Sequence, residues 1–138
     1  MKRTFFDTNI LVYLFDGDAT NKQARSRELL TTSAKEGWFL SSTQVLQEFY
    51  VVVTGKLAVP LSSEDAEQAI RKLLSLPIVE IDGETLLYAI QIKRRYGFSF
   101  WDALIVQAAL KGGAQQLYTE DLQHGQIIEG LRIINPFL

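Results

Sequence analysis

Several acidic side chains follow apolar segments or lie within them, where a carboxylate could bind a metal ion. Asp7 directly follows a short apolar segment, and Asp121 lies two residues past another that ends at Thr119. Glu48 and Asp102 lie within longer apolar stretches. Carboxylates suit Mg²⁺, which takes oxygen ligands and keeps several of its waters. Such an ion polarises a phosphodiester, lowers the pKa of a water and stabilises the departing oxygen.

Glu48 has the most unusual surroundings of the four acids. It lies inside 45–53, one of the most apolar stretches of the chain, and at helical spacing it shares a face with apolar residues. An unpaired buried carboxylate costs several kcal/mol, so a buried Glu48 would be paired, protonated or bound to metal. The alternative is that Glu48 lies at the edge of the apolar stripe and reaches solvent.

Local capping is an alternative explanation for the other acids. Ser99 and Asp102 have the spacing of a capping box, and an acid in the first turn also suits the helix dipole. Asp7, Asp121 and the further candidate Asp82 each follow an expected strand, where turns and N-caps favour Asp. A capping residue can also face a crevice, so the two roles are compatible.

Apolar periodicity predicts alternating strands and helices that would position these acids. We expect strands at 3–6, 38–40, 78–81, 116–119 and 131–134. We expect helices at 9–15, 21–35, 43–54, 83–96 and 99–111, and one that follows the start signal at 62–65 and ends by Pro77. This alternation is typical of an α/β domain with a mostly parallel sheet of four to five strands, spanning 1–138. Ligands of such sheets bind beyond the carboxyl ends of the strands.

Composition excludes several kinds of site. The chain has 138 residues, no Cys and one His, so disulfides, thiolate nucleophiles and Cys-ligated zinc are ruled out. The formal net charge of −2 argues against a broadly basic nucleic-acid binder. Apolar runs such as 49–53 are far shorter than the ~20 residues of a membrane span. We therefore expect a cytoplasmic protein with no membrane partner.

Four motifs in a fixed order carry a family resemblance. They are an apolar strand ending in Asp-Thr-Asn at 7–9, Glu48 in a helix, Phe-Trp-Asp-Ala-Leu-Ile at 100–105, and Tyr-Thr-Glu-Asp at 118–121. Their order and spacing, over the whole chain, resemble the PIN domain. Within that family they are similar to the VapC-like toxin ribonucleases of prokaryotic toxin–antitoxin pairs.

This resemblance implies a site, a substrate and partners. It implies a Mg²⁺- or Mn²⁺-dependent endoribonuclease with an RNA substrate, a cognate antitoxin and commonly a homodimer. The implied metal-binding and catalytic acids are Asp7, Glu48, Asp102 and Asp121, with Asn9 and Thr119 as polar support. Asp121 is preferred to the adjacent Glu120 because the family pattern spaces the acid two residues after Ser or Thr.

Electrostatics adds two expectations. Asp7 is fixed at a strand end and needs little ordering, so we expect it to contact the metal directly. Like charges that share a site disfavour ionisation, so without metal at least one acid should have a raised pKa.

One basic run is a candidate for gripping phosphates. Lys93, Arg94 and Arg95 lie at the end of an expected helix. They would contact RNA phosphates if this turn lies near the acids. The alternative, which we favour, is a solvated last turn that complements the helix dipole.

Two other functions are compatible with parts of the sequence. A haloacid-dehalogenase-type phosphotransferase also begins with a strand ending in Asp, but it needs a second Asp where this chain has Asn9. A catalytically inactive PIN-like module that binds RNA or protein is the other alternative. All the expected acids are present, which favours the nuclease over that module.

Overall fold

Short apolar segments form six strands in the computed structural model, which describes residues 2–138. The strands are β1 (Thr4–Phe6), β2 (Phe39–Ser42), β3 (Ile78–Val79), β4 (Gln116–Tyr118), β5 (Ile127–Ile128) and β6 (Leu131–Ile134). They lie in the order β3-β2-β1-β4-β6-β5. All neighbouring strands run parallel to each other except β5 and β6, which form an antiparallel pair. The predicted α/β class with a mostly parallel sheet is confirmed.

Helices connect the strands. They are α1 (Thr8–Val12), the 3₁₀ helix η1 (Tyr13–Phe15), α2 (Thr20–Glu36), α3 (Thr43–Gly55), α4 (Ser63–Leu73), α5 (Gly83–Tyr96) and α6 (Phe100–Lys111). Side chains of Ser42, Ser62, Asp82 and Ser99 accept a backbone N–H in the first turns of α3, α4, α5 and α6. These caps satisfy amides that the helix itself leaves unpaired.

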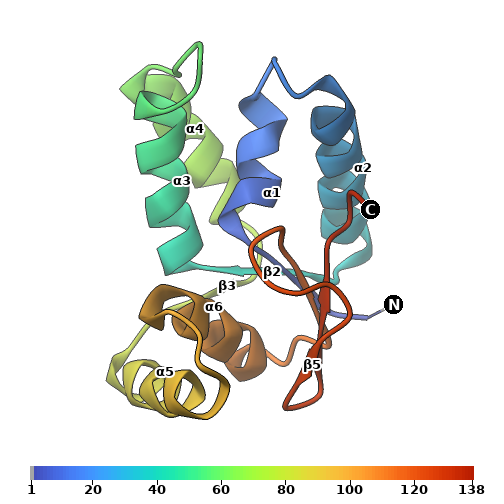
Figure 1. Ribbon diagram of the computed structural model, residues 1–138. Helices are drawn as coiled ribbons and strands as arrows, with labels where there is room; N and C mark the ends of the chain where they lie inside the picture. Colours follow the sequence, from blue (N-terminus) through green and yellow to red (C-terminus); the bar gives the residue numbers. More distant parts are fainter. Residues whose placement is uncertain (1) are drawn as a thin grey trace.

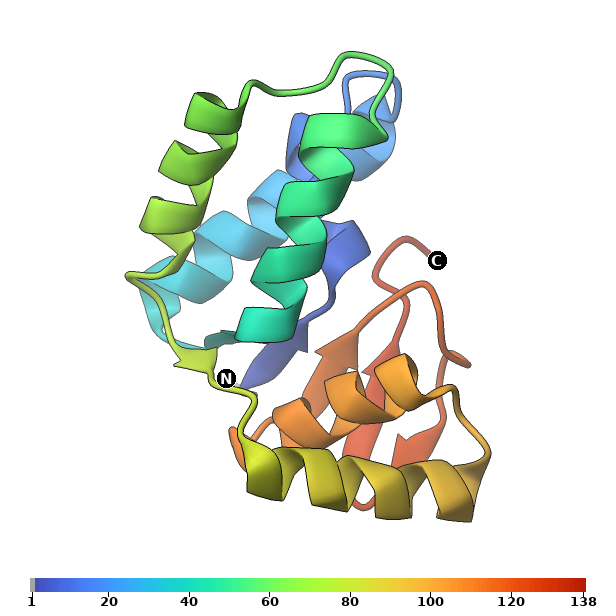
Figure 2. The ribbon, with the colours of Figure 1, turned by 90° about the vertical axis from the view of Figure 1, so that its left-hand side faces the viewer.

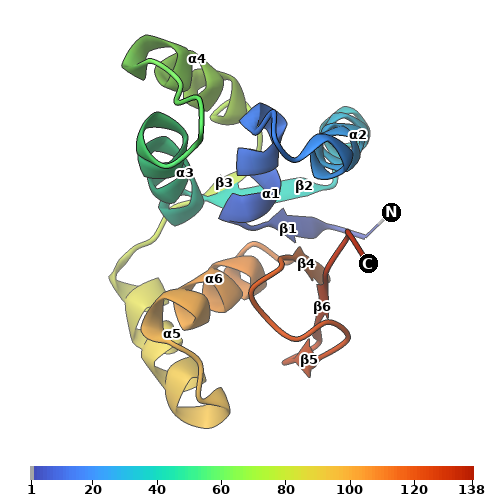
Figure 3. The same cartoon turned by 45° about the horizontal axis from the view of Figure 1, so that its top comes forward.

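The two faces of the sheet carry different helices. Figure 1 shows α1 to α3 on one side of the strands, and Figure 3 shows α1 to α4 on that side with α5 and α6 on the other. The chain moves from β1 through β2 to β3 with helices on the first face, then returns to β4 with helices on the second face. Right-handed crossovers require this change of face when the direction across the sheet reverses.

Side chains from both faces of the sheet form the core. Phe5, Phe6, Phe39 and Leu117 are fully or almost fully buried in the central strands. Figure 2 shows α5 packed along α6, at the end of the molecule away from α4. Gly112 ends α6 against the sheet, where a Cβ atom would lie 2.4 Å from a methyl carbon of Leu40. The backbone at the end of α6 comes so close to the Leu40 side chain here that glycine is favoured at position 112.

The structure corrects three details of the predicted elements. Strand β5 was not predicted, because it has two residues, of which Ile127 is exposed, and so shows no periodicity. The first helix, expected at 9–15, begins at Thr8 with Asp7 as its N-cap and tightens into a 3₁₀ turn after Val12. The third strand stops at Val79, because the Ile81 amide donates to the Thr43 side chain instead of to a neighbouring strand.

Within residues 2–138, no helix is both long and apolar enough to cross a membrane.

Candidate functional site

The central strands β1 and β4 define the place where a crevice is expected. The chain leaves β1 toward β2 and returns to β4 from the opposite side of the sheet, so the helices that follow diverge. This point, beyond the carboxyl ends of the strands, is where open parallel sheets bind ligands. Asp7 follows β1, and its amide donates to the Tyr118 carbonyl at the end of β4, at 3.0 Å. The segment 119–121 follows β4 into the same place.

Asp7 is the most buried acid of this group, with 4% of its surface exposed. Its Oδ1 accepts the Thr8 amide and its Oδ2 accepts the Thr119 hydroxyl, both at 2.7 Å. The pKa of Asp7 is raised to about 6: burial is the main cause, the charges of Asp121 and Glu48 add to it, and the two hydrogen bonds oppose it. The direction of this shift agrees with the expectation that one acid has a raised pKa, but burial contributes more to it than repulsion among the acids.

Glu48 is half-buried on α3 and is held by neutral donors. Its Oε2 accepts the Thr8 hydroxyl and its Oε1 accepts the Gln44 amide nitrogen, both at 2.8 Å. The same Gln44 nitrogen lies 3.3 Å from the Trp101 carbonyl in the first turn of α6. Gln44 therefore joins Glu48 to the helix that carries Asp102.

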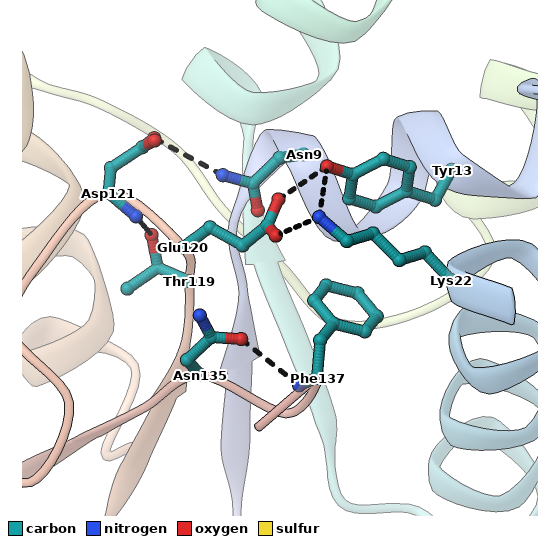
Figure 4. Close-up of polar contacts among 8 residues, drawn as sticks. All are labelled: Asn9, Tyr13, Lys22, Thr119, Glu120, Asp121, Asn135 and Phe137. Carbon is teal, nitrogen blue, oxygen red and sulfur yellow. Dashed lines mark hydrogen bonds and ion pairs between the residues drawn. The ribbon is translucent and has the colours of Figure 1, made fainter. Parts of the chain in front are cut away.

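Asp121 and Glu120 are adjacent but turn to different partners. Figure 4 shows Asp121 facing Asn9, whose side-chain nitrogen donates to Asp121 at 3.2 Å. The Asp121 amide donates to the Thr119 hydroxyl at 3.0 Å. Glu120 instead contacts Tyr13 and Lys22.

Asp102 completes the group of acids. Its amide donates to the Ser99 side chain, so the predicted cap is present. Burial raises the pKa of Asp121, and the nearby charges of Asp102, Glu120 and Glu48 raise it further. The Asp121 carboxylate thus lies within the range of the charges of Asp102 and Glu48, and Asp7 within the range of those of Asp121 and Glu48.

This group suits a hydrated ion better than a bare one. Among residues 2–138, no three acidic or imidazole side chains stand so that they could hold a metal ion directly. Asp7 and Glu48 already use both carboxylate oxygens in hydrogen bonds. Mg²⁺ keeps several waters, which can span the remaining distances, so the donor chemistry fits this ion.

Unpartnered oxygens also support a polar ligand. The side-chain oxygens of Asn9 and Gln44 are shielded from solvent and have no hydrogen-bond partner within residues 2–138. Asn9 lines an open depression of about 300 Å³ together with Tyr13, Glu48 and Asp121. Buried polar atoms are normally satisfied, so these two are candidate contacts for water or a ligand.

Other side chains considered from the sequence lie in different contacts. Asp82 caps α5 and forms an ion pair with Lys111 at 2.9 Å. Hydrogen bonds from the Thr85 amide and hydroxyl, and then from Lys111, lower the pKa of Asp82. The His124 ring accepts the Asn135 amide.

The basic run of α5 is solvent-exposed. Lys93, Arg94 and Arg95 lie in the last turn of the helix, and Arg95 pairs with Glu129. Glu129 precedes β6 and so lies by the amino end of that strand, whereas the acids follow the carboxyl ends. This pairing agrees with a solvated last turn, and phosphate contact by the run stays a prediction.

Sequence reasoning missed the residues that connect the acids. The Thr8 hydroxyl donates to Glu48, 40 positions away, so no local pattern indicated this contact. Gln44 lies one helical turn before Glu48, and that spacing was the available signal. Lys22 and Glu120 are 98 positions apart, so no local pattern could have joined them.

Comparison with known proteins agrees with this arrangement. The sequence profile of the PIN domain family matches residues 4–128. No curated protein matches this chain. The structure resembles VapC20 from Mycobacterium tuberculosis, described as a sarcin–ricin-loop-cleaving toxin, with a TM-score of 0.68 and 23% identity over 86% of this chain and 89% of that one.

Two solved assemblies contain similar chains. A toxin–antitoxin complex from Klebsiella pneumoniae matches with a TM-score of 0.68 and 23% identity, covering 96% of this chain and 97% of that one. VapBC2 from Rickettsia felis, bound to a DNA fragment from its promoter, matches with a TM-score of 0.66 and 21% identity, covering 94% and 96%. At this identity the likeness establishes the fold.

Proposed function

This chain belongs to the PIN domain family, and on that premise we propose that it is a Mg²⁺- or Mn²⁺-dependent endoribonuclease. The observation that carries the proposal is that Asp121, after β4, lies near enough to Asp7, after β1, and to Glu48 and Asp102, on α3 and α6, for their charges to interact. Burial is the main cause of the raised pKa values of Asp7 and Asp121, and repulsion from the neighbouring carboxylates adds to both. A bound divalent ion would relieve this repulsion.

The acids would divide the work of holding the ion. Asp7, Glu48, Asp102 and Asp121 would bind it directly or through its waters, with Asn9 and Thr119 as polar support. When bound, the ion would polarise the phosphodiester and lower the pKa of the attacking water. Thr119 fixes the orientation of the Asp7 carboxylate, and Thr8 and Gln44 fix that of Glu48. Fixed carboxylates need little reorganisation when the transition state forms.

We further propose that the chain is the toxin of a toxin–antitoxin pair, with RNA as substrate, a cognate antitoxin as partner, and a homodimer as its assembly in the cytoplasm. The toxin–antitoxin complexes among the similar structures support this part of the proposal. The description of the mycobacterial relative as an RNA-loop-cleaving toxin supports RNA as the substrate class.

Cleavage of a mixed RNA pool tests the activity. The chain should cleave RNA with Mn²⁺ and not with EDTA. Asp7→Asn keeps the shape of the side chain and removes its charge, so cleavage should fall to background. Asp65→Asn makes the same change at an exposed residue on α4 and should cleave like the wild type. RNA binding without metal-stimulated cleavage by the wild type would instead favour the inactive binding module.

A further inference from the structure

A second polar cluster lies beside the acids. The Glu120 carboxylate accepts the Tyr13 hydroxyl at 2.5 Å and the Lys22 ammonium at 2.6 Å. Lys22 also donates to the Tyr13 oxygen at 3.2 Å, so the three side chains form a closed triangle (Figure 4). Tyr13 belongs to η1, Lys22 to α2, and Glu120 to the loop after β4. The triangle therefore ties this loop to two elements on one face of the sheet.

Aromatic packing supports the triangle. The Phe137 ring meets the Tyr13 ring edge to face, with centroids 5.3 Å apart. The Lys22 ammonium lies 5.0 Å from the Tyr13 centroid and 5.4 Å from that of Phe137, within cation–π range. The Phe137 amide donates to the Asn135 side chain at 3.0 Å, which holds the ring-bearing segment (Figure 4).

Asp121 is the next residue after Glu120, so the two carboxylates share one short backbone segment. Glu120 is anchored by Tyr13 and Lys22, while Asp121 is held through its amide by Thr119 and through its carboxylate by Asn9. We propose that Lys22, Tyr13 and Glu120 are positioning residues that hold the 119–121 segment so that Asp121, and not Glu120, faces the metal. The role toward a metal rests on the proposed function. The claim that these residues hold the 119–121 segment rests on the hydrogen bonds alone.

The effect of Lys22 on metal binding has two opposing contributions. Lys22 neutralises a carboxylate next to the acids, so its removal would leave a more negative site that attracts a divalent cation more strongly. If Lys22 also positions Asp121, its removal would weaken metal binding. The sign of the change in Mn²⁺ affinity therefore separates positioning from charge.

Lys22 is also a poor candidate for a general stabilising role. Its side chain is 41% exposed, and that of Glu120 is 19% exposed. Ion pairs this open to water contribute little to global stability. We expect its effect to be confined to the 119–121 segment.

Amide hydrogen exchange in EDTA tests the geometry without metal or RNA. In Lys22→Met the Asp121 amide should exchange roughly three- to ten-fold faster than in the wild type, because local opening becomes easier. Glu120→Gln and Tyr13→Phe should act in the same direction. Lys35→Met, an exposed change on the same helix, should have no effect. The Phe5 amide in β1 should exchange at the wild-type rate in all four variants.

Two exchange results would overturn the inference. A wild-type rate at Asp121 in Lys22→Met and Glu120→Gln would show that the triangle does not hold the segment. An equal rise at Asp121 and Phe5 would show a global effect on stability instead of local positioning.

Mn²⁺ binding, measured without RNA, tests the consequence for the site. Lys22→Met should weaken binding roughly ten-fold, the loss typical when a residue that orients a metal-binding side chain is removed, and Lys22→Arg, which can keep the ion pair, should bind nearly as the wild type does. Tighter or unchanged binding in Lys22→Met would overturn the positioning role. Absence of Mn²⁺ binding by the wild type would contradict the proposed function, while the exchange result would still decide whether the triangle holds the segment.

Discussion

The Thr119 hydroxyl donates to Asp7 across 112 positions of sequence, at 2.7 Å, and the same oxygen accepts the Asp121 amide at 3.0 Å. One side chain thus links two of the four acids. Thr119 is fully buried, so no water can readily replace either contact. Its hydroxyl also opposes the effect of burial on the pKa of Asp7.

Thr119→Val should therefore affect both stability and activity. The substitution keeps the shape and removes the hydroxyl, so the free energy of unfolding should fall by about 1–3 kcal/mol, the typical cost of an unsatisfied buried group. The pKa of Asp7 should rise further, which should move the rising limb of the RNA-cleavage pH profile to higher pH. Denaturant unfolding and rates measured across pH check both effects.

Thr119→Ser is the matched control, because it retains the hydroxyl. It should keep the wild-type pH profile. A Thr119→Val variant whose pH profile equals that of the wild type would contradict the role of this hydroxyl.

The raised pKa of Asp7 predicts a pH-dependent stability. The pKa is about 6 in the folded chain against a reference value of 3.8. Between these pH values the unfolded chain loses the proton first, so the native state binds more protons and loses stability as the pH rises. The loss is complete above the folded pKa and amounts to about 3 kcal/mol.

Asp7→Asn isolates this contribution, because it cannot titrate. In EDTA, the unfolding free energy of the variant minus that of the wild type should increase by about 2.4 kcal/mol from pH 4 to pH 7 and then level off. Denaturant unfolding at a series of pH values measures this difference. A difference that does not change with pH would show that Asp7 has an ordinary pKa in the folded chain.

Gln44 should matter although its side chain is neutral and does not titrate. It is buried and donates to both Glu48 and the Trp101 carbonyl. Gln44→Leu should lower the unfolding free energy by about 1–2 kcal/mol and slow RNA cleavage roughly ten-fold, because Glu48 loses a fixed donor. Gln47→Leu, a change at an exposed residue on the same helix, should do neither. Equal activity of the two variants would contradict a positioning role for Gln44.

Helices whose ends carry capping residues could be predicted from the sequence. Helices α4, α5 and α6 carry caps at Ser62, Asp82 and Ser99, and their starts are as predicted. Gly97, with a φ of 75°, ends α5 at the expected position, because a left-handed residue stops a helix. Strand β5 has no such signal, since it exists only through its pairing with β6.

The site could be predicted in part for a similar reason. Asp7 and Asp121 follow strands that periodicity locates, and parallel neighbours bring their carboxyl ends together. The order β3-β2-β1-β4-β6-β5 is what makes those strands neighbours, and periodicity does not reveal that order. The contacts of Lys22 with Glu120 depend on how α2 packs beside the loop after β4, which is a tertiary feature without a local pattern.

Direct Mn²⁺ titration of the wild type and single variants, by calorimetry or electron paramagnetic resonance, tests whether the grouped carboxylates bind one divalent ion. We expect the wild type to bind Mn²⁺, and Asp7→Asn and Asp121→Asn each to bind it at least roughly ten-fold more weakly, since each loses a carboxylate ligand. Asp65→Asn should bind like the wild type. Equal Mn²⁺ affinity in wild type, Asp7→Asn and Asp121→Asn would contradict a shared metal site.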